Sequence, residues 1–308
     1  MDLVLQLDTI DAMVGQEKSY YQLSNRDEEM DPILAERFGP FCMEWRDRML
    51  IFYHKLLNRI GSTTAHETLE IACSYLDRFL AAPGLATEAL RNKPLFQLLS
   101  TTVLYTAVKM HEVSALTPTL MANISHGVFT DEDVEEMELV LAQTLQWRLN
   151  PPTSHSFIRL FLDLIPERQM DREMRAIAYK LATYQTEWTM RNELLFTERK
   201  AVIAYWAFEN ALDALHIYNE EISAYLCLAV FGDEDMAPGQ MESQRLLKRV
   251  LKIHFRYILP AIPSPAPSTA KSWFWFGQKS SSPDTLPMSE YDYRIHASSP
   301  RSVGGNVA

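Results

Sequence analysis

Apolar residues recur along this chain at the spacing of an α-helix, and the segment between Pro94 and Lys109 shows this most strongly. It has no charged side chain before Lys109, and a helix without a charged face is normally buried. Pro94 suits the first turn, because the missing N–H group of proline needs no partner there. We therefore expect a buried helix at the centre of a helical domain, with apolar residues on most sides, namely Leu95, Leu98, Leu99, Val103, Leu104, Ala107 and Val108.

The flanking segments predict four more helices, over residues 41–60, 64–80, 118–126 and 130–146. The second of these has the clearest apolar stripe, formed by Leu69, Ala72, Cys73, Leu76, Phe79 and Leu80. Gly61 can end the first helix, and Thr130 is a good N-cap for the last. A loop over 81–93 leads into the central helix. The prolines that follow Asn150 end this five-helix unit, because proline disfavours helix in the residue before it.

The second half of the chain repeats this plan. Its pattern predicts helices over residues 153–164, 174–188, 198–212, 219–230 and 240–257. Two successive five-helix units, each with a strongly apolar third helix, indicate an internal duplication. We therefore expect an all-α fold with two tandem five-helix repeats, over residues 38–150 and 151–259.

Both ends of the chain differ from this pattern. Residues 1–37 carry nine acidic and three basic side chains, which predicts a mostly disordered or loosely docked acidic arm with a short helix near 31–38. Residues 260–308 are rich in Pro and Ser and predict a disordered tail.

Composition narrows the class of protein. The 308 residues are 47% hydrophobic and 22% charged, which suits one or two globular domains. Three cysteines lie far apart within apolar helical patterns, as is typical of reduced core residues in an intracellular protein, namely Cys42, Cys73 and Cys227. The N-terminus is acidic and shows no secretory signal.

Charge and hydropathy argue against two kinds of partner. A net charge of −11 argues against nucleic acid. The longest apolar run, over 224–231, is far shorter than the ~20 residues that span a membrane. We expect a protein of the nucleus or cytoplasm with neither partner.

Motifs for catalysis or metal binding are incomplete. His66 and Glu67 begin a two-histidine zinc motif, but Glu70 stands where the second histidine belongs. The chain has no phosphate-binding or dinucleotide-binding glycine motif and no paired cysteines at zinc spacing. The acidic run over 131–138 is typical of a solvated helix face. We therefore expect no catalytic residue, no metal and no cofactor.

Three segments, in order, resemble the cyclin box. HETLEIACSYLDRFL at 66–80 is similar to its second helix, and VKMHE at 108–112 to the end of its third. EMELVLAQTLQWRLNPPTSHSF at 136–157 is similar to its fifth helix and to the exit into a second repeat. The resemblance to the cyclin family is most specific over 66–157, extends over 41–66 and 157–258, and implies a five-plus-five helical fold.

The resemblance also implies a function. Cyclins bind a cyclin-dependent Ser/Thr protein kinase and activate it without catalysing a reaction themselves, and we expect such a regulatory subunit, in cell-cycle control. The lysine and glutamate that contact the kinase in this family correspond by motif to Lys109 and Glu138, with Met110 and Glu112 as neighbouring candidates. The alternatives are a transcription-type cyclin, a transcription adaptor of the same fold, or an all-α enzyme with a pocket between the repeats.

Other matched residues have structural roles in the family. Asp77 corresponds to an acidic residue that pairs with an arginine of the first helix, and either Arg46 or Arg48 can be that arginine. Leu98 corresponds to a core leucine of the third helix. For Lys109 and Glu138, the alternative to kinase binding is a charged pair that only ties two helices together.

Departures from the family give further expectations. Tyr53, His54 and Lys55 stand where cyclin boxes often carry Trp and aliphatic residues, so peptide docking through the first helix is expected to be weak or altered. In the tail, three serines precede proline and are candidate phosphorylation sites, namely Ser264, Ser282 and Ser299. The tail resembles turnover signals of short-lived proteins, and its WFWF cluster at 273–276 is expected to dock onto the domain or a partner.

Overall fold

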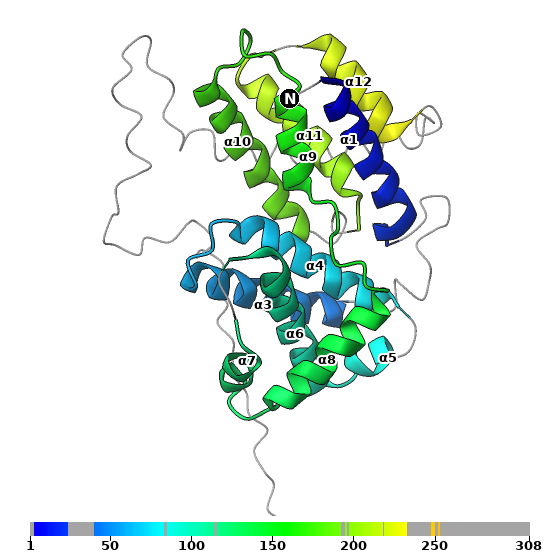
Figure 1. Cartoon of the computed structure of the whole chain (residues 1–308), viewed down its shortest axis with the longest axis vertical. Helices are drawn as coiled ribbons and strands as arrows, with labels where there is room; N and C mark the ends of the chain where they lie inside the picture. Colours follow the sequence, from blue (N-terminus) through cyan, green and yellow to red (C-terminus); the bar gives the residue numbers. More distant parts are fainter. Residues whose placement is uncertain are drawn as a thin grey trace, which may run out of the picture. The chain divides into compact units, whose positions relative to one another are not determined.

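The computed structural model describes residues 3–23, 40–82, 85–113, 116–191, 195, 197–217 and 219–232, together with 248, 249 and 252. The chain divides into two units, Met1–Ala261 and Ile262–Ala308, and every described residue lies in the first. All elements in this described part are helices (Figure 1), so the predicted all-α class is confirmed. No helix among these residues is long and apolar enough to cross a bilayer.

The first repeat contains the five predicted helices and one more. The predicted ones are α3 (Pro40–Arg59), α4 (Ala65–Ala81), α6 (Lys93–His111), α7 (Pro118–Ile124) and α8 (Asp131–Thr144). The additional helix, α5 (Leu85–Ala89), lies within the segment that was expected to be a loop. Ala86 and Ala89 of α5 are buried, so a contact with the core orders this turn.

Helix α6 is the centre of this repeat, as its apolar sequence predicts. It packs against α4, α5, α7 and α8, and every residue from Leu99 to Val108 is buried. The side chain of Asn92 caps its N-terminus by accepting a hydrogen bond from Leu95 N at 3.3 Å. Leu98 is partly buried at the edge of this core.

Two predicted helix ends have the expected chemistry. Gly61 has a φ of 69° and ends α3, and Ser62 N donates a hydrogen bond back to Leu57 O at 3.1 Å. At the start of α8, Asp133 N donates to Thr130 Oγ1 at 3.2 Å and Thr130 N donates to Asp133 Oδ2 at 2.7 Å. This reciprocal capping box fixes where α8 begins.

The second repeat is built around α11 (Lys200–Ala214), which packs against α9 (Ser154–Asp163), α10 (Arg172–Arg191) and α12 (Glu220–Phe231). The helix predicted over 240–257 falls almost wholly outside the described residues. Two side chains from this segment contact α11. Lys252 forms an ion pair with Asp213, and the Lys248 ammonium lies 5.0 Å from the centre of the Trp206 ring.

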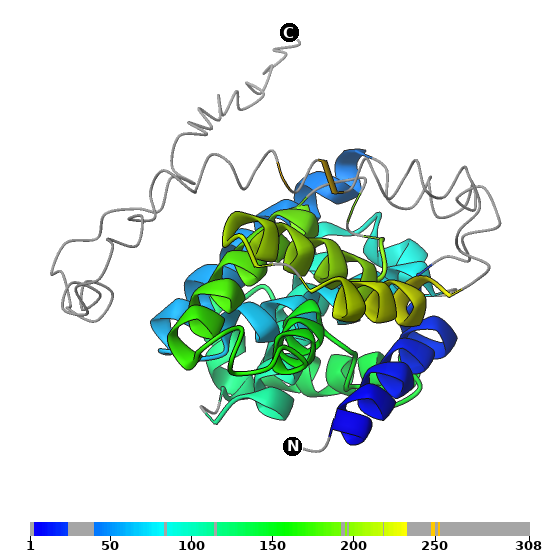
Figure 2. The same ribbon diagram turned by 90° about the horizontal axis from the view of Figure 1, so that it is seen from above.

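Residues 3–21 are helical, so of the two alternatives expected for the N-terminal arm, disorder is wrong for these residues. Helix α1 (Leu3–Gln16) continues into a short π-helix, η1 (Glu17–Tyr21), and we call the two together the N-terminal strap. Its side chains at positions 6, 10, 14 and 17 are buried, and α1 packs against α12 and α9 (Figure 2).

The remaining terminal predictions fall outside the described residues. They are the helix near 31–38, the tail over 260–308 with its WFWF cluster, and the candidate phosphorylation sites Ser264, Ser282 and Ser299.

Candidate functional site

Lys109 and Glu138 meet on the surface of the first repeat. Lys109 lies in the last turn of α6 and Glu138 in the middle of α8, and the packing of these helices brings the two side chains together. The Lys109 Nζ lies 3.1 Å from Oε1 and 3.0 Å from Oε2 of Glu138. The lysine side chain is 51% exposed and the glutamate 20%. The hydrogen bond to Glu138 raises the pKa of Lys109, so the ammonium stays charged.

This pair keeps capacity for a further partner. The Lys109 ammonium can donate three hydrogen bonds and an ionised carboxylate can accept about four, so the two hydrogen bonds between them leave lone pairs of Glu138 unused. The ammonium also lies 5.5 Å from the centre of the Tyr105 ring, and this contact helps to orient it.

Exposed apolar side chains follow each member of the pair. Met110, the residue after Lys109, is 52% exposed, and Leu139, the residue after Glu138, is 50% exposed. Trp147, in the loop after α8, is 67% exposed and has a φ of 60°. An apolar centre with a polar rim is typical of a protein-binding surface, and Met110 and Leu139 adjoin the charged pair in sequence. Met110 is among the residues expected from the sequence, whereas Leu139 and Trp147 are not.

Glu112 makes its contacts within the chain. It follows the last residue of α6, and its Oε1 accepts hydrogen bonds from the hydroxyl groups of Ser62, Thr64 and Thr68 at 2.5, 2.9 and 2.5 Å. These residues lie in the loop before α4 and in its first turn. Of the four residues singled out from sequence, Lys109 and Glu138 are thus in contact, Met110 follows Lys109 in α6, and Glu112 ties α6 to the start of α4.

Arg46 is the arginine that pairs with Asp77. Its Nε lies 2.7 Å from Oδ1 and its Nη2 2.7 Å from Oδ2, and both side chains are almost fully buried. Arg46 also donates to the backbone carbonyl of Met190 in α10, so this pair reaches the second repeat. Arg48, the other candidate, pairs with Glu44 at the exposed surface of α3.

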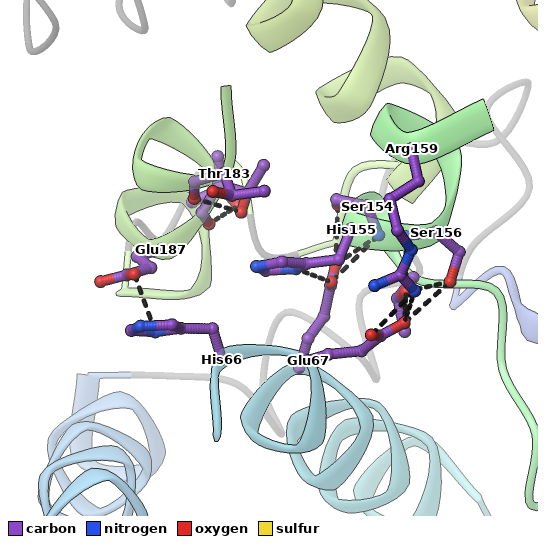
Figure 3. Close-up of polar contacts among 12 residues, drawn as sticks. His66, Glu67, Ser154, His155, Ser156, Arg159, Thr183 and Glu187 are labelled. Carbon is purple, nitrogen blue, oxygen red and sulfur yellow. Dashed lines mark hydrogen bonds and ion pairs between the residues drawn. The ribbon is translucent and has the colours of Figure 1, made fainter. Parts of the chain in front are cut away.

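A polar cluster connects α4 to the second repeat (Figure 3). Both carboxylate oxygens of Glu70 lie 3.0 Å from Ser154 N, and Oε1 accepts from Ser154 Oγ at 2.7 Å. Oε2 lies 3.1 Å from His155 Nδ1. Burial alone would raise the pKa of Glu70, but the contacts with His155 and Ser154 outweigh it and lower the pKa to about 2. Glu70 therefore caps the N-terminus of α9 as an ionised group.

Two neighbouring residues of α4 extend this cluster. Glu67 Oε1 lies 2.8 Å from Arg159 Nη2 of α9 and also accepts from the hydroxyl groups of Thr153 and Ser156. His66 Nδ1 lies 2.8 Å from Glu187 Oε1 of α10, and that hydrogen bond raises the pKa of His66. The segment 66–70 that resembles an incomplete zinc motif thus supplies several of the contacts between the repeats. Among the described residues, no three His, Cys, Asp or Glu side chains are arranged to hold a metal ion.

The first repeat is similar in sequence to known proteins. Residues 44–150 match the family model described as the cyclin N-terminal domain. The chain is 33% identical over 108 residues to G1/S-specific cyclin-D1 of Rattus norvegicus, which is 35% of this chain and 35% of that protein. It is 29% identical over 155 residues to G2/mitotic-specific cyclin-2 of Medicago sativa, which is 50% of this chain and 41% of that protein. The match therefore spans less than half of the length of these relatives.

A solved structure extends the similarity in fold. The X-ray structure of a viral cyclin from herpesvirus saimiri superposes with a TM-score of 0.51, at 13% identity, and covers 82% of this chain and 98% of that one. At this identity the similarity concerns the fold alone.

Proposed function

Because this chain belongs to the cyclin family, we propose that it is a non-catalytic subunit that binds and activates a cyclin-dependent Ser/Thr protein kinase in cell-cycle control. The observation that carries this proposal is the contact between Lys109 and Glu138. These are the two positions at which the family's motif has its kinase-contacting lysine and glutamate, and here their side chains meet on an exposed surface. Met110 and Leu139 supply exposed apolar side chains beside them.

The pair rests on a rigid support, which favours binding. Lys109 directly follows ten consecutive buried residues of α6, and Glu138 lies next to the buried Met137 of α8. A partner therefore meets charges whose positions are already fixed, and less conformational entropy is lost on binding. The unused lone pairs of Glu138 can accept charge-assisted hydrogen bonds from the partner's backbone N–H groups.

Activation follows from preferential binding. A protein kinase is active when a glutamate of its helix αC pairs with the lysine of its strand β3. A subunit that binds this arrangement better than the inactive one shifts the population toward it. A shift from about 1:99 to 99:1 needs a preference of roughly 5.5 kcal/mol. ATP and magnesium belong to the kinase in this mechanism, so the present chain needs no cofactor. We propose the nucleus or cytoplasm, where such kinases act, as its location.

Purified components test this proposal. The full chain is mixed with a panel of purified cyclin-dependent kinases of both the cell-cycle and the transcription type, and with a kinase of another class as the control. Binding is measured by analytical gel filtration and activity by phosphorylation of a peptide substrate. We expect a one-to-one complex with at least one cyclin-dependent kinase, a marked gain in its activity, and none with the control kinase.

The kinase that responds also separates the alternatives. A response from a cell-cycle kinase supports the proposal as stated, whereas a response only from a transcription-type kinase favours the transcription-type cyclin. No binding at micromolar concentrations to any member of the panel would contradict a kinase-activating function.

A further inference from the structure

The N-terminal strap packs on the second repeat, although it precedes the first repeat in the chain. Helix α1 runs beside α12 in both views (Figures 1 and 2) and also packs against α9. At the end of the strap, the Tyr20 ring centre lies 3.9 Å from the guanidinium carbon of Arg148, and the Tyr21 ring centre lies 4.8 Å from that of Arg78. The strap thus extends from the second repeat to the loop after α8.

Glu17 is the buried acidic residue of the strap and is 3% exposed. Its carboxylate accepts hydrogen bonds from Lys200 N and, at 3.2 Å, from Ala201 N, the first two residues of α11. The residue at the N-cap of α11 is Arg199, whose side chain makes no capping hydrogen bond. The first N–H groups of a helix need acceptors from outside it, and Glu17 supplies them from a residue 183 positions away along the chain.

Charged groups from two other elements surround this carboxylate. A small cavity lined by Glu17 is also lined by Asp77 and Arg78 of α4 and by Glu198, Arg199 and Lys200 at the start of α11. Burial raises the pKa of Glu17 to about 7, because the loss of hydration outweighs the attraction of Arg199 and of the two backbone donors. An exposed glutamate keeps a pKa near 4.5.

We propose that Glu17 makes the N-terminal strap a proton-dependent latch, which docks more tightly on the second repeat below neutral pH and is released more often above it. The docked strap binds the proton more strongly than the released strap does, so docking loses strength as the pH rises from 4.5 through 7. With these two pKa values, the docking equilibrium is about tenfold weaker at pH 8 than at pH 6.

Release of the strap acts on the connection between the repeats. Arg78 donates hydrogen bonds to Arg148 O at 2.9 Å and to Leu145 O at 3.3 Å, and so holds the loop after α8. Tyr20 and Tyr21 stack on the same two arginines. An undocked strap removes both rings, which leaves the loop more exposed and less restrained. This effect requires no bound kinase, so it can be measured on the chain alone.

Hydrogen exchange of the full chain at pH 6 and pH 8 measures the latch. Exchange of the backbone amides in residues 3–21 is corrected for the intrinsic effect of pH and expressed relative to exchange of the same residues in a free peptide. For the wild type we expect this relative protection to fall about tenfold between pH 6 and pH 8. The variant Glu17→Gln cannot ionise at this position, and its relative protection should change by less than about twofold, whether its strap is docked or released.

The matched control is Asp11→Asn, which removes an exposed carboxylate from the same strap and should keep the tenfold change. A wild-type strap whose relative protection changes by less than about twofold would overturn the proposal. So would a Glu17→Gln variant that keeps the tenfold change, or an Asp11→Asn variant that loses it.

Discussion

Arg46 and Asp77 form a bidentate ion pair between α3 and α4, with both N–O distances at 2.7 Å and almost no exposure to solvent. The guanidinium also donates to the Met190 carbonyl in α10. The Arg46 side chain of α3 therefore bonds to α4 in the first repeat and to α10 in the second.

Arg46→Ala should destabilise the protein strongly, because it leaves the Asp77 carboxylate buried without its counter-ion. Breaking a buried pair in this way typically costs about 3–5 kcal/mol. Arg48→Ala is the matched control, since it removes an exposed arginine from the same helix and should change stability by no more than about 0.5 kcal/mol. Urea denaturation measures both. Equal, small losses for the two variants would show that the Arg46–Asp77 pair does not support the fold.

Ionised Glu70 should make the free energy of unfolding fall as the solution is acidified. Its pKa is about 2 in the folded chain and near 4.5 when exposed, so its ionised form stabilises the folded state above pH 4.5, and this contribution is lost as the pH falls toward 2. Between pH 5.5 and pH 3 the loss should be about 2 kcal/mol.

The measurement is the free energy of unfolding at these two pH values for the wild type and for Glu70→Gln. The variant should be less stable at pH 5.5 and should lose less stability on acidification, while Glu136→Gln, an exposed change on α8, should follow the wild type. A Glu70→Gln variant with the wild-type pH dependence would mean that this carboxylate does not cap α9 as an ionised group.

His66 gives a test of the contact between α4 and α10. The hydrogen bond to Glu187 raises the pKa of His66, so this contact stabilises the folded chain below pH 6.5 and weakens as the pH rises through the raised value. The side chain is 48% exposed, so solvent screening limits the contribution to about 1 kcal/mol or less. In an NMR titration, Glu187→Gln should lower the His66 midpoint, whereas Glu173→Gln, an exposed change on the same helix, should leave it unchanged. An unaltered His66 midpoint in the Glu187→Gln variant would show that the contact is absent in solution.

The helices of the two repeats were predictable because their signals are local. Thr130 and Asp133 carry a capping signal within four residues, Gly61 supplies a left-handed helix end, and the uncharged run of α6 indicates burial whatever surrounds it. Helix α5 was not predicted, because only five residues form it and their burial comes from contacts with α4 and α6.

The helical strap was not predicted, because the many acidic residues over 1–37 indicate disorder more strongly than its short apolar pattern indicates a helix. Ile10, Val14 and the neighbouring buried positions 6 and 17 have helical spacing, which is the signal that could have identified it. That signal is short, and the surface that stabilises it comes from α9 and α12, far along the chain. Composition alone could not reveal this surface.

The candidate site was predictable only in part. Family motifs identified Lys109 and Glu138, but local sequence could not reveal that α6 and α8 bring them into contact. The choice between Arg46 and Arg48 also depended on the orientation of α3 against α4. The contacts of Glu67 and Glu70 with α9 depend on how the two repeats meet, which no local pattern specifies.

The most direct test of the proposed function compares Lys109→Ala and Glu138→Ala with matched controls on the same helices. Lys93→Ala removes an exposed lysine from the other end of α6, and Glu136→Ala an exposed glutamate from α8. Each variant is measured for melting temperature, for affinity to the responding kinase and for activation of that kinase.

The lysine of the pair is half exposed and stays solvated, so loss of the pair should cost at most about 1 kcal/mol of stability, or about 2–4 °C in melting temperature. Binding to the kinase should lose about 2–5 kcal/mol, mainly through faster dissociation, which is roughly a 30- to 4,000-fold loss of affinity. The controls should bind as the wild type does. Folded Lys109→Ala and Glu138→Ala variants that still bind and activate the kinase as the wild type does would contradict the assignment of this pair to the kinase interface.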